Sequence, residues 1–189
     1  MNYDLKAYAK VYKKVLTPSF CNKIIKGLEN VNWEKHQFYN PNTDTLSNNK
    51  NELSVTCDSS GYVEELNKLV WETIEKYVLK DFKECKKWWN GWQGFTPVRF
   101  NKYEKGELMK LHCDHIHTAF DGERKGVPIL SIVGVLNNNY TGGKFIMWQK
   151  EHIKIDQGDI LIFPSTFMYP HEVTKIEDGC RYSFVSWTW

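Results

Sequence analysis

The residue pattern of the chain changes after Phe95-Thr96-Pro97, and this change is the strongest indication of the fold. From there to the C-terminus, short runs rich in β-branched and aromatic residues alternate with Gly, Asn, Asp and Pro, a pattern that predicts strands joined by turns. About eight short strands at this spacing are typical of a double-sheet jelly roll. The predicted strands are 98–103, 108–114, 129–136, 143–148, 152–155, 159–163, 171–176 and 181–188.

The first half of the chain predicts helices. One helix is expected to begin at Thr17-Pro18, because Thr can cap free amide groups and Pro is preset for the first helical position. A second is expected to begin near residues 58–60, ahead of a single apolar stripe. Residues 36–58 are rich in Asn, Thr, Asp and Ser, which indicates two strands joined by a mobile loop. The expected fold class is therefore α+β: a double-stranded β-helix (jelly roll) core with N-terminal helices packed on one sheet.

Composition indicates the number of domains, the classes of partner and the cellular compartment to expect. The 189 residues, 41% of them hydrophobic, are enough for one sizeable core and predict a single domain. The 25 basic and 23 acidic residues are spread along the chain, so no strong electrostatic footprint for nucleic acid or a membrane is expected. Five cysteines without a CxxC pair, and no apolar segment typical of export or insertion, predict a soluble cytoplasmic protein with reduced thiols.

Three side chains form a candidate metal site. His112 and Asp114 flank Cys113 at the end of a predicted strand, where alternation places residues 112 and 114 on the same face. His171 opens a later strand and becomes their neighbour if the strands wrap into a barrel. Two imidazoles and one carboxylate form the facial triad that suits Fe(II) oxygenases, and the lack of thiolate ligands argues against structural zinc. His-x-Asp also occurs by chance in many proteins, so the assignment depends on its context.

Other histidines and one cysteine near this motif are weaker candidates for ligands. His115 and His117 continue the cluster, but on a continuing strand both would point away from the ligand face. They are expected at the rim or in solvent, where one of them could contact substrate. His36 and His152 are expected to be surface or packing residues, and Cys113 to be packed rather than metal-bound.

Arg181 is the candidate anchor for a negatively charged cosubstrate. It begins the last predicted strand, ten residues after His171, and the Asp178-Gly179 turn would place the two on adjacent strands. A buried guanidinium can pair bidentately with a carboxylate, here the distal carboxylate of 2-oxoglutarate. Tyr103 offers a hydroxyl to the same carboxylate, and Trp187, at an even offset from Arg181, would wall the pocket. Each also has a structural alternative, the two aromatics as core residues and the arginine as a surface ion pair.

Together these residues resemble the prolyl 4-hydroxylase-like branch of the 2-oxoglutarate/Fe(II) oxygenase superfamily. The order, the spacing and the flanking glycines fit, and the resemblance covers residues 95–189. The matching segments are Arg99-Phe-Asn101-Lys-Tyr103-Glu-Lys-Gly106-Glu, His112-x-Asp114, Gly142-Gly143-Lys-Phe145, Gly158-Asp159-Ile-Leu-Ile-Phe163-Pro164-Ser165, His171-Glu-Val and Gly179-Cys-Arg181-Tyr182.

The resemblance implies a helical, substrate-side N-terminal part (1–95) and a catalytic β core (96–189). It implies hydroxylation of an unactivated C–H bond with Fe(II), 2-oxoglutarate and O2, a prolyl residue of a protein or peptide as substrate, and release of succinate and CO2. Ascorbate would be a further cofactor. The expected metal ligands are His112, Asp114 and His171, and the expected cosubstrate residues are Tyr103, Arg181 and Trp187.

Two other functions stay open at this point. A demethylase of N-methyl nucleobases also carries Asn101-x-Tyr103 followed by His-x-Asp, but such enzymes typically add a second arginine after the anchor, and none follows Arg181. A catalytically degenerate jelly-roll module could keep the fold for binding or structure, although the intact ligand set disfavours this. The tryptophans of 88–92 form either an exposed patch for a proline-containing peptide or part of the core.

Overall fold

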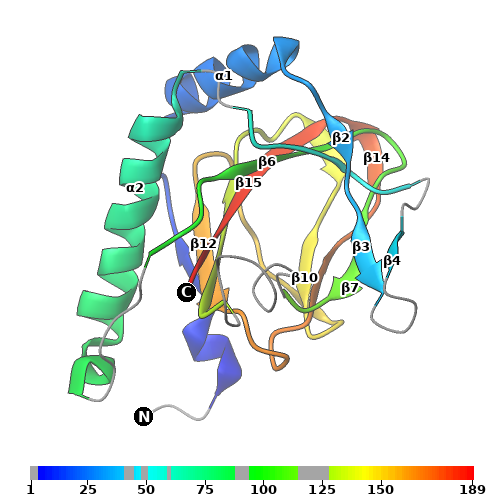
Figure 1. The fold of residues 1–189 in the computed structure, drawn as a ribbon. Coiled ribbons are helices and arrows are strands. Elements are labelled where there is room, and N and C mark those ends of the chain that lie inside the picture. The colour runs from blue at the N-terminus through cyan, green and yellow to red at the C-terminus, as the bar shows by residue number, and fades with distance from the viewer. Residues whose placement is uncertain (1–3, 41–44, 48–50, 59–60, 88–93, 115–127) are drawn as a thin grey trace.

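Residues 4–40, 45–47, 51–58, 61–87, 94–114 and 128–189 are described by the computed structural model. Within them the strands form a seven-stranded sheet, a four-stranded sheet and two two-stranded sheets, and two α-helices lie to one side (Figure 1). Neither of these helices is long and apolar enough to cross a membrane. The predictions that fall outside the described residues concern Trp88, Trp89, Trp92, His115, His117 and the loop segments 41–44, 48–50 and 117–127.

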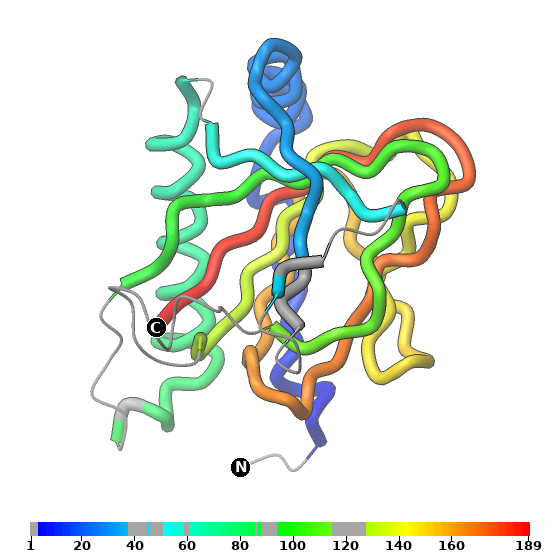
Figure 2. Tube along the Cα trace, turned by 45° about the vertical axis from the view of Figure 1, so that its right-hand side comes forward, coloured from blue at the N-terminus to red at the C-terminus, as the bar shows by residue number. Residues whose placement is uncertain are grey.

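The seven-stranded sheet is antiparallel and positions most of the site. Its strands, in spatial order, are β1 (Lys10–Tyr12), β12 (Ile160–Pro164), β8 (Leu130–Val135), β15 (Arg181–Thr188), β6 (Arg99–Tyr103), β5 (Ser54–Thr56) and β2 (Glu34–Lys35). Figure 2 shows β8, β15 and β6 running side by side, with the longer helix behind them. The C-terminal strand therefore lies in the middle of the sheet.

The four-stranded sheet packs against one face of the large sheet. Its strands, in spatial order, are β11 (Glu151–His152), β10 (Phe145–Met147), β13 (His171–Val173) and β7 (Met109–His112). The two-stranded sheets are β14 (Ile176–Gly179) with β9 (Tyr140–Gly142), and β3 (Phe38–Asn40) with β4 (Thr45–Ser47).

The helices begin for different local reasons. α1 (Pro18–Gly27) begins as predicted, because the Thr17 hydroxyl accepts a hydrogen bond from the Phe20 amide at 3.2 Å. α2 (Val63–Lys76) begins later than the predicted 58–60, without a side-chain cap but with two glutamates in its first turn, which complement the helix dipole. The shorter helical turns are Leu5–Tyr8, Leu28–Asn30, the π-helical Tyr77–Asp81 and Lys83–Lys87.

The large sheet separates two hydrophobic clusters. Its helix-facing cluster includes Phe20, Ile24, Leu66, Val70, Ile74, Phe100, Ile132, Ile162 and Phe184. The cluster between the two sheets includes Tyr103, Val133, Leu161, Phe163, Phe145, Met147 and Val173. Because successive side chains of a strand point to opposite faces, each central strand contributes to both clusters. Burying one such large apolar side chain stabilises the fold by about 1.5–3 kcal/mol.

Several strands differ from their predicted extent. The segment 36–58 contains β3, β4 and β5 rather than two strands, and the predicted strand 171–176 is divided between β13 and β14. The predicted strand 108–114 ends at His112. Strands β1 and β9 were not predicted, because three residues are too few to display a period of two.

Candidate metal and cosubstrate site

The two candidate histidine ligands face each other. His112 ends β7 and His171 begins β13, and the two are direct partners in this antiparallel pair. Their ring centroids are 4.4 Å apart. Direct partners on neighbouring strands hold their Cβ atoms about 4.5–5.5 Å apart on one face, so both imidazoles can reach a common point.

Asp114 completes the cluster. Its Oδ1 lies 3.5 Å from Nε2 of His112 and 3.8 Å from Nε2 of His171, and the ligand atoms of all three residues lie within 4.8 Å of one another. Because β7 ends at His112, strand alternation is not what positions the carboxylate. Instead Ser131, on β8 of the opposite sheet, donates a hydrogen bond to Oδ2 of Asp114 at 2.5 Å, and its hydroxyl lies 2.7 Å from that of Ser165.

Backbone carbonyl groups orient both imidazoles. Nδ1 of His112 lies 2.7 Å from the carbonyl oxygen of Lys110, and Nδ1 of His171 lies 3.0 Å from that of Tyr169. When Nδ1–H donates to these oxygens, each Nε2 keeps a lone pair directed toward Asp114. This is the usual way in which proteins fix the tautomer of a metal-ligating histidine.

The electrostatic environment keeps the carboxylate ionised. Burial alone would raise the pKa of Asp114, but the two imidazoles and the Ser131 hydroxyl outweigh burial and hold that pKa well below its usual range. Burial lowers the pKa of His171, which favours the neutral imidazole. A neutral imidazole and a carboxylate are the forms of these groups that bind a metal ion.

The donor set fits a ferrous ion. Two imidazole nitrogens and one carboxylate oxygen leave coordination positions open, the arrangement found in non-haem Fe(II) oxygenases. Cys113 is not among the clustered ligands, and its thiol donates to the Phe167 carbonyl at 3.4 Å. His152 is exposed on β11, as expected. His36 is half-buried and is not among the clustered ligands, and burial lowers its pKa to about 4.

Arg181 is buried without a negatively charged partner among the described residues. Its side chain is 1% exposed, its Nη1 donates to the Ser183 hydroxyl at 2.8 Å, and its Nε makes no hydrogen bond. The guanidinium carbon lies 5.1 Å from the centroid of the Tyr103 ring. A buried cation is costly unless it is paired, so this environment is suited to an anion from outside the protein. The alternative of a surface ion pair is wrong.

Gly143 makes room for the arginine. Its φ is +57°, and a Cβ at this position would lie 2.6 Å from Cδ1 of Ile176 and 3.1 Å from Cδ of Arg181. A side chain would therefore press on the stem of the guanidinium. This contact is a physical reason for glycine at position 143.

The expected adjacency of Arg181 and His171 is wrong. Arg181 lies on β15 of the large sheet, whereas His171 lies on β13 of the four-stranded sheet, and β14 comes between them in the chain. The two residues line the same cavity from opposite sheets. Tyr103, on β6, is the direct strand partner of Arg181.

The wall of this cavity includes one residue with an expected role, Trp187, and two residues for which no role was expected, Arg99 and Asn101. Trp187 lines the cavity as its even offset predicted, and its indole nitrogen is buried without a hydrogen-bond partner among the described residues. Arg99 and Asn101 also line it, and they share a face of β6 with Tyr103. Their alternate spacing was the signal that could have identified them.

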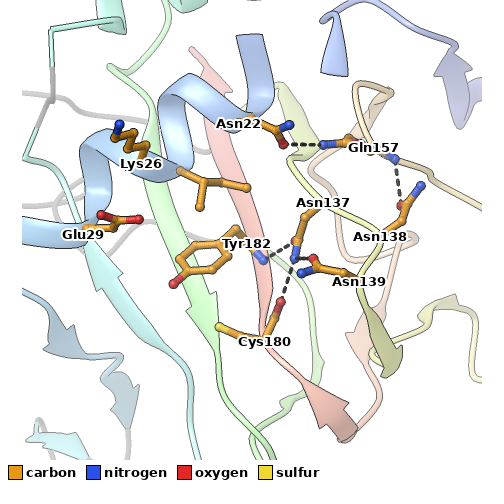
Figure 3. Close-up of a pocket in the computed structure, with 10 residues that line it drawn as sticks. Asn22, Lys26, Glu29, Asn137, Asn138, Asn139, Gln157, Cys180 and Tyr182 are labelled. Atoms are coloured by element: carbon orange, nitrogen blue, oxygen red, sulfur yellow. Dashed lines mark hydrogen bonds between the residues drawn. The ribbon is translucent and has the colours of Figure 1, made fainter. Parts of the chain in front are cut away.

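A larger cleft lies elsewhere, between α1 and the turn that follows β8 (Figure 3). Its amide side chains form hydrogen bonds within the protein. The Gln157 side chain donates to Asn22 at 3.2 Å, and the Asn137 side chain donates to the Cys180 carbonyl at 2.7 Å. The Gln157 backbone amide also donates to Asn138 at 2.9 Å. These bonds connect the turn to the helix, which makes a structural role sufficient.

Comparisons with curated proteins point to one superfamily. Residues 98–189 match the sequence profile of the 2OG-Fe(II) oxygenase superfamily. A PKHD-type hydroxylase of Shewanella sp. (strain MR-7) is 28% identical over 97 residues, covering 49% of this chain and 42% of the relative. One of Prochlorococcus marinus is 27% identical over 143 residues, covering 73% and 58%. The chain thus spans about half the length of the curated relatives it matches.

Solved structures share the fold across almost the whole chain. A prolyl hydroxylase of Trichoplax adhaerens, solved with a hypoxia inducible factor peptide fragment, has a TM-score of 0.65 at 17% identity, covering 97% of this chain and 84% of that one. A viral collagen prolyl hydroxylase from Paramecium Bursaria Chlorella virus-1 has a TM-score of 0.61 at 15% identity, covering 96% and 94%. The resemblance to prolyl 4-hydroxylase-like 2-oxoglutarate oxygenases is thereby confirmed: residues 98–189 match the superfamily profile, and the solved prolyl hydroxylases share the fold.

Proposed function

We propose that the chain is a single-domain, Fe(II)- and 2-oxoglutarate-dependent dioxygenase that hydroxylates a prolyl residue of a protein or peptide, with release of succinate and CO2. The observation that carries the proposal is the convergence of His112, Asp114 and His171 within 4.8 Å. Arg181, buried and without a charged partner among the described residues, lines the same cavity. The superfamily match supports hydroxylation chemistry. The prolyl substrate is supported by the relatives named as prolyl hydroxylases. In this proposal the two packed sheets are a double-stranded β-helix.

Each residue of the site has a task in this reaction. His112, Asp114 and His171 hold the iron, and Ser131 keeps the carboxylate turned toward the two imidazoles. Arg181 pairs with the distal carboxylate of 2-oxoglutarate, in a setting where burial strengthens the charge-assisted hydrogen bonds. When bound, the iron and 2-oxoglutarate would supply the oxidising chemistry. The apolar residues between the sheets exclude water from the cavity.

Two aromatic residues bound the cavity, Tyr103 at the end with Arg181 and Trp187 at the other end. Tyr103 is 2% exposed and stacks with the Arg181 guanidinium, so that its ring restricts where the arginine can point. Its hydroxyl is a further donor for the same carboxylate. Trp187 bounds the cavity six residues further along β15.

The first experiment separates an oxygenase from a binding module. Fe(II) and 2-oxoglutarate added without oxygen should give the weak visible charge-transfer band of a chelated keto acid, and folded protein without this band argues for the module. Proline-containing peptides are then incubated with oxygen, with and without ascorbate, and analysed by mass spectrometry. A gain of one oxygen on proline, together with succinate, supports the proposal. Oxidation only at other residues contradicts its prolyl part.

A further inference from the structure

The cavity contains a second arginine that the proposed reaction does not use. Arg99 begins β6 and lines the cavity together with the candidate ligands. Its Nε is buried and makes no hydrogen bond, and no carboxylate of the described residues lies within ion-pair distance of its guanidinium. The side chain as a whole is half-buried, but a guanidinium that loses part of its hydration in this way is stabilised when an anion pairs with it.

Arg99 and Arg181 serve different ends of the cavity. In the β6–β15 pair, Arg99 is the partner of Val185 and Arg181 is the partner of Tyr103. These two rungs are four residues apart, which at about 3.3 Å per residue is about 13 Å. The Arg99 guanidinium carbon lies 5.1 Å from the centroid of the Trp187 ring. Trp187 is six residues from Arg181 along β15, two more than the separation of the two rungs. The two arginines therefore start from well-separated rungs of the sheet, and the Arg99 guanidinium lies over Trp187.

The Arg99 end is also the end nearer the metal ligands. Trp187, over which the guanidinium lies, is the β8 partner of Ser131, and Ser131 bonds Asp114. Burial lowers the pKa of Arg99, while Tyr103 and Asp114 act to raise it. Asp114 does not come within ion-pair distance of Arg99, because its oxygens face the histidines and Ser131.

Among the described residues that line the cavity, the charges of the loaded site leave Arg99 without a counter-charge, a step that rests on the proposed function. The two positive charges of Fe(II) and the one of Arg181 are balanced by Asp114 and the two carboxylates of 2-oxoglutarate. Neutral imidazoles add nothing. One positive charge remains at Arg99, in a cavity where poor solvation strengthens its attraction to an anion.

We propose that Arg99 is a specificity-determining residue that binds a carboxylate of the primary substrate. The planar guanidinium matches a carboxylate bidentately, and its stacking on Trp187 fixes the plane in which that carboxylate must lie. The carboxylate has two chemical sources, an acidic side chain beside the oxidised residue or the free C-terminus of a short peptide. Neutral peptides are poor substrates.

The test uses matched peptides that differ in one charge. Pentapeptides with central proline carry Glu or Gln beside it, and each is made as a C-terminal acid and as an amide. Binding is measured by calorimetry to the protein loaded with Fe(II) and 2-oxoglutarate without oxygen, and turnover is measured with oxygen. We expect the wild type to prefer one kind of acidic peptide at least tenfold. Arg99→Gln should bind acidic and neutral peptides equally, with the KM for 2-oxoglutarate unchanged.

Controls separate recognition from folding. Lys102→Gln removes a positive charge from the same strand but from its opposite face, where Lys102 pairs with Glu104, and it should keep the preference. Arg99→Lys retains the charge without the planar fork and should keep part of the preference, which a merely structural role does not explain. Equal binding of both peptides by the wild type, or no binding of any peptide, overturns the proposal. So does a raised 2-oxoglutarate KM in Arg99→Gln, because that makes Arg99 a cosubstrate residue.

A second peptide set distinguishes this failure from failure of the proposed function. Leucine replaces proline in each peptide. If acidic leucine peptides are oxidised as well as acidic proline peptides, the prolyl assignment fails and the role of Arg99 stands. If succinate forms slowly in wild-type protein without any peptide but no charge preference is found, the oxygenase assignment stands and the role of Arg99 fails.

Discussion

His112 and His171 lie directly opposite each other across β7 and β13, although strands β8 to β12 come between them in the chain. Asp114 lies beside them, and Ser131 of the other sheet donates a hydrogen bond to its carboxylate. The candidate metal site thus depends on the packing of the two sheets. The following changes test its separate parts.

Asp114→Ala should abolish iron-dependent succinate formation, because it removes the single carboxylate of the donor set. Iron content after dialysis and succinate yield are the measurements. The protein should stay folded, because Asp114 lies outside the strands. Circular dichroism, which reports the sheets rather than the site, checks this. Undiminished turnover would show that the carboxylate is not a ligand.

Ser131→Ala should weaken iron binding by about 10- to 100-fold, the usual effect of losing a hydrogen bond that orients a metal ligand. Ser165→Ala is the matched control, because Ser165 contacts Ser131 rather than the carboxylate. Its effect should be smaller. Fe(II) titrations of both variants compare the two, and equal affinities would argue against a positioning role for Ser131.

Arg181→Met should raise the KM for 2-oxoglutarate by about 10- to 150-fold, the equivalent of losing about 1.5–3 kcal/mol from hydrogen bonds to a charged group. The ligand-free variant should be at least as stable as the wild type, because the buried cation has no charged partner among the described residues. Steady-state kinetics and thermal unfolding test the two halves. A large loss of stability with unchanged KM would identify Arg181 as a structural residue.

Gly143→Ala should impair 2-oxoglutarate binding without touching the cavity directly. The added Cβ would lie 2.6 Å from Ile176 Cδ1 and 3.1 Å from Arg181 Cδ, at a φ of +57° that costs a non-glycine residue about 1–2 kcal/mol. Both the midpoint of unfolding and the cosubstrate affinity should fall. Gly61→Ala, where φ is +85° but no atom lies within 4 Å of the new Cβ, isolates the backbone cost and should leave the affinity unchanged.

The sequence predicted the parts of this site that depend on residue type and periodicity. The residue types of the candidate ligand set are visible in its motif, and the inward face of β15 with Arg181 and Trp187 follows from strand alternation. The meeting of His171 with His112 depends instead on how the strands pair. The sequence did not predict that β14 separates His171 from Arg181, because short strands leave little periodicity. It also could not predict the Ser131 contact with Asp114, which forms between sheets and has no local signal.

The alternation of side chains along β15 affects both the cavity and the core. Arg181, Ser183, Val185 and Trp187 line the cavity, while Phe184, between them, packs with the helices. Sliding this strand by one position would exchange the two sets, sending a guanidinium into the helical layer and a phenyl ring into the cavity. A chain in the wrong register would therefore lose its stability and its capacity for catalysis together, so that only correctly threaded molecules persist long enough to be reactive.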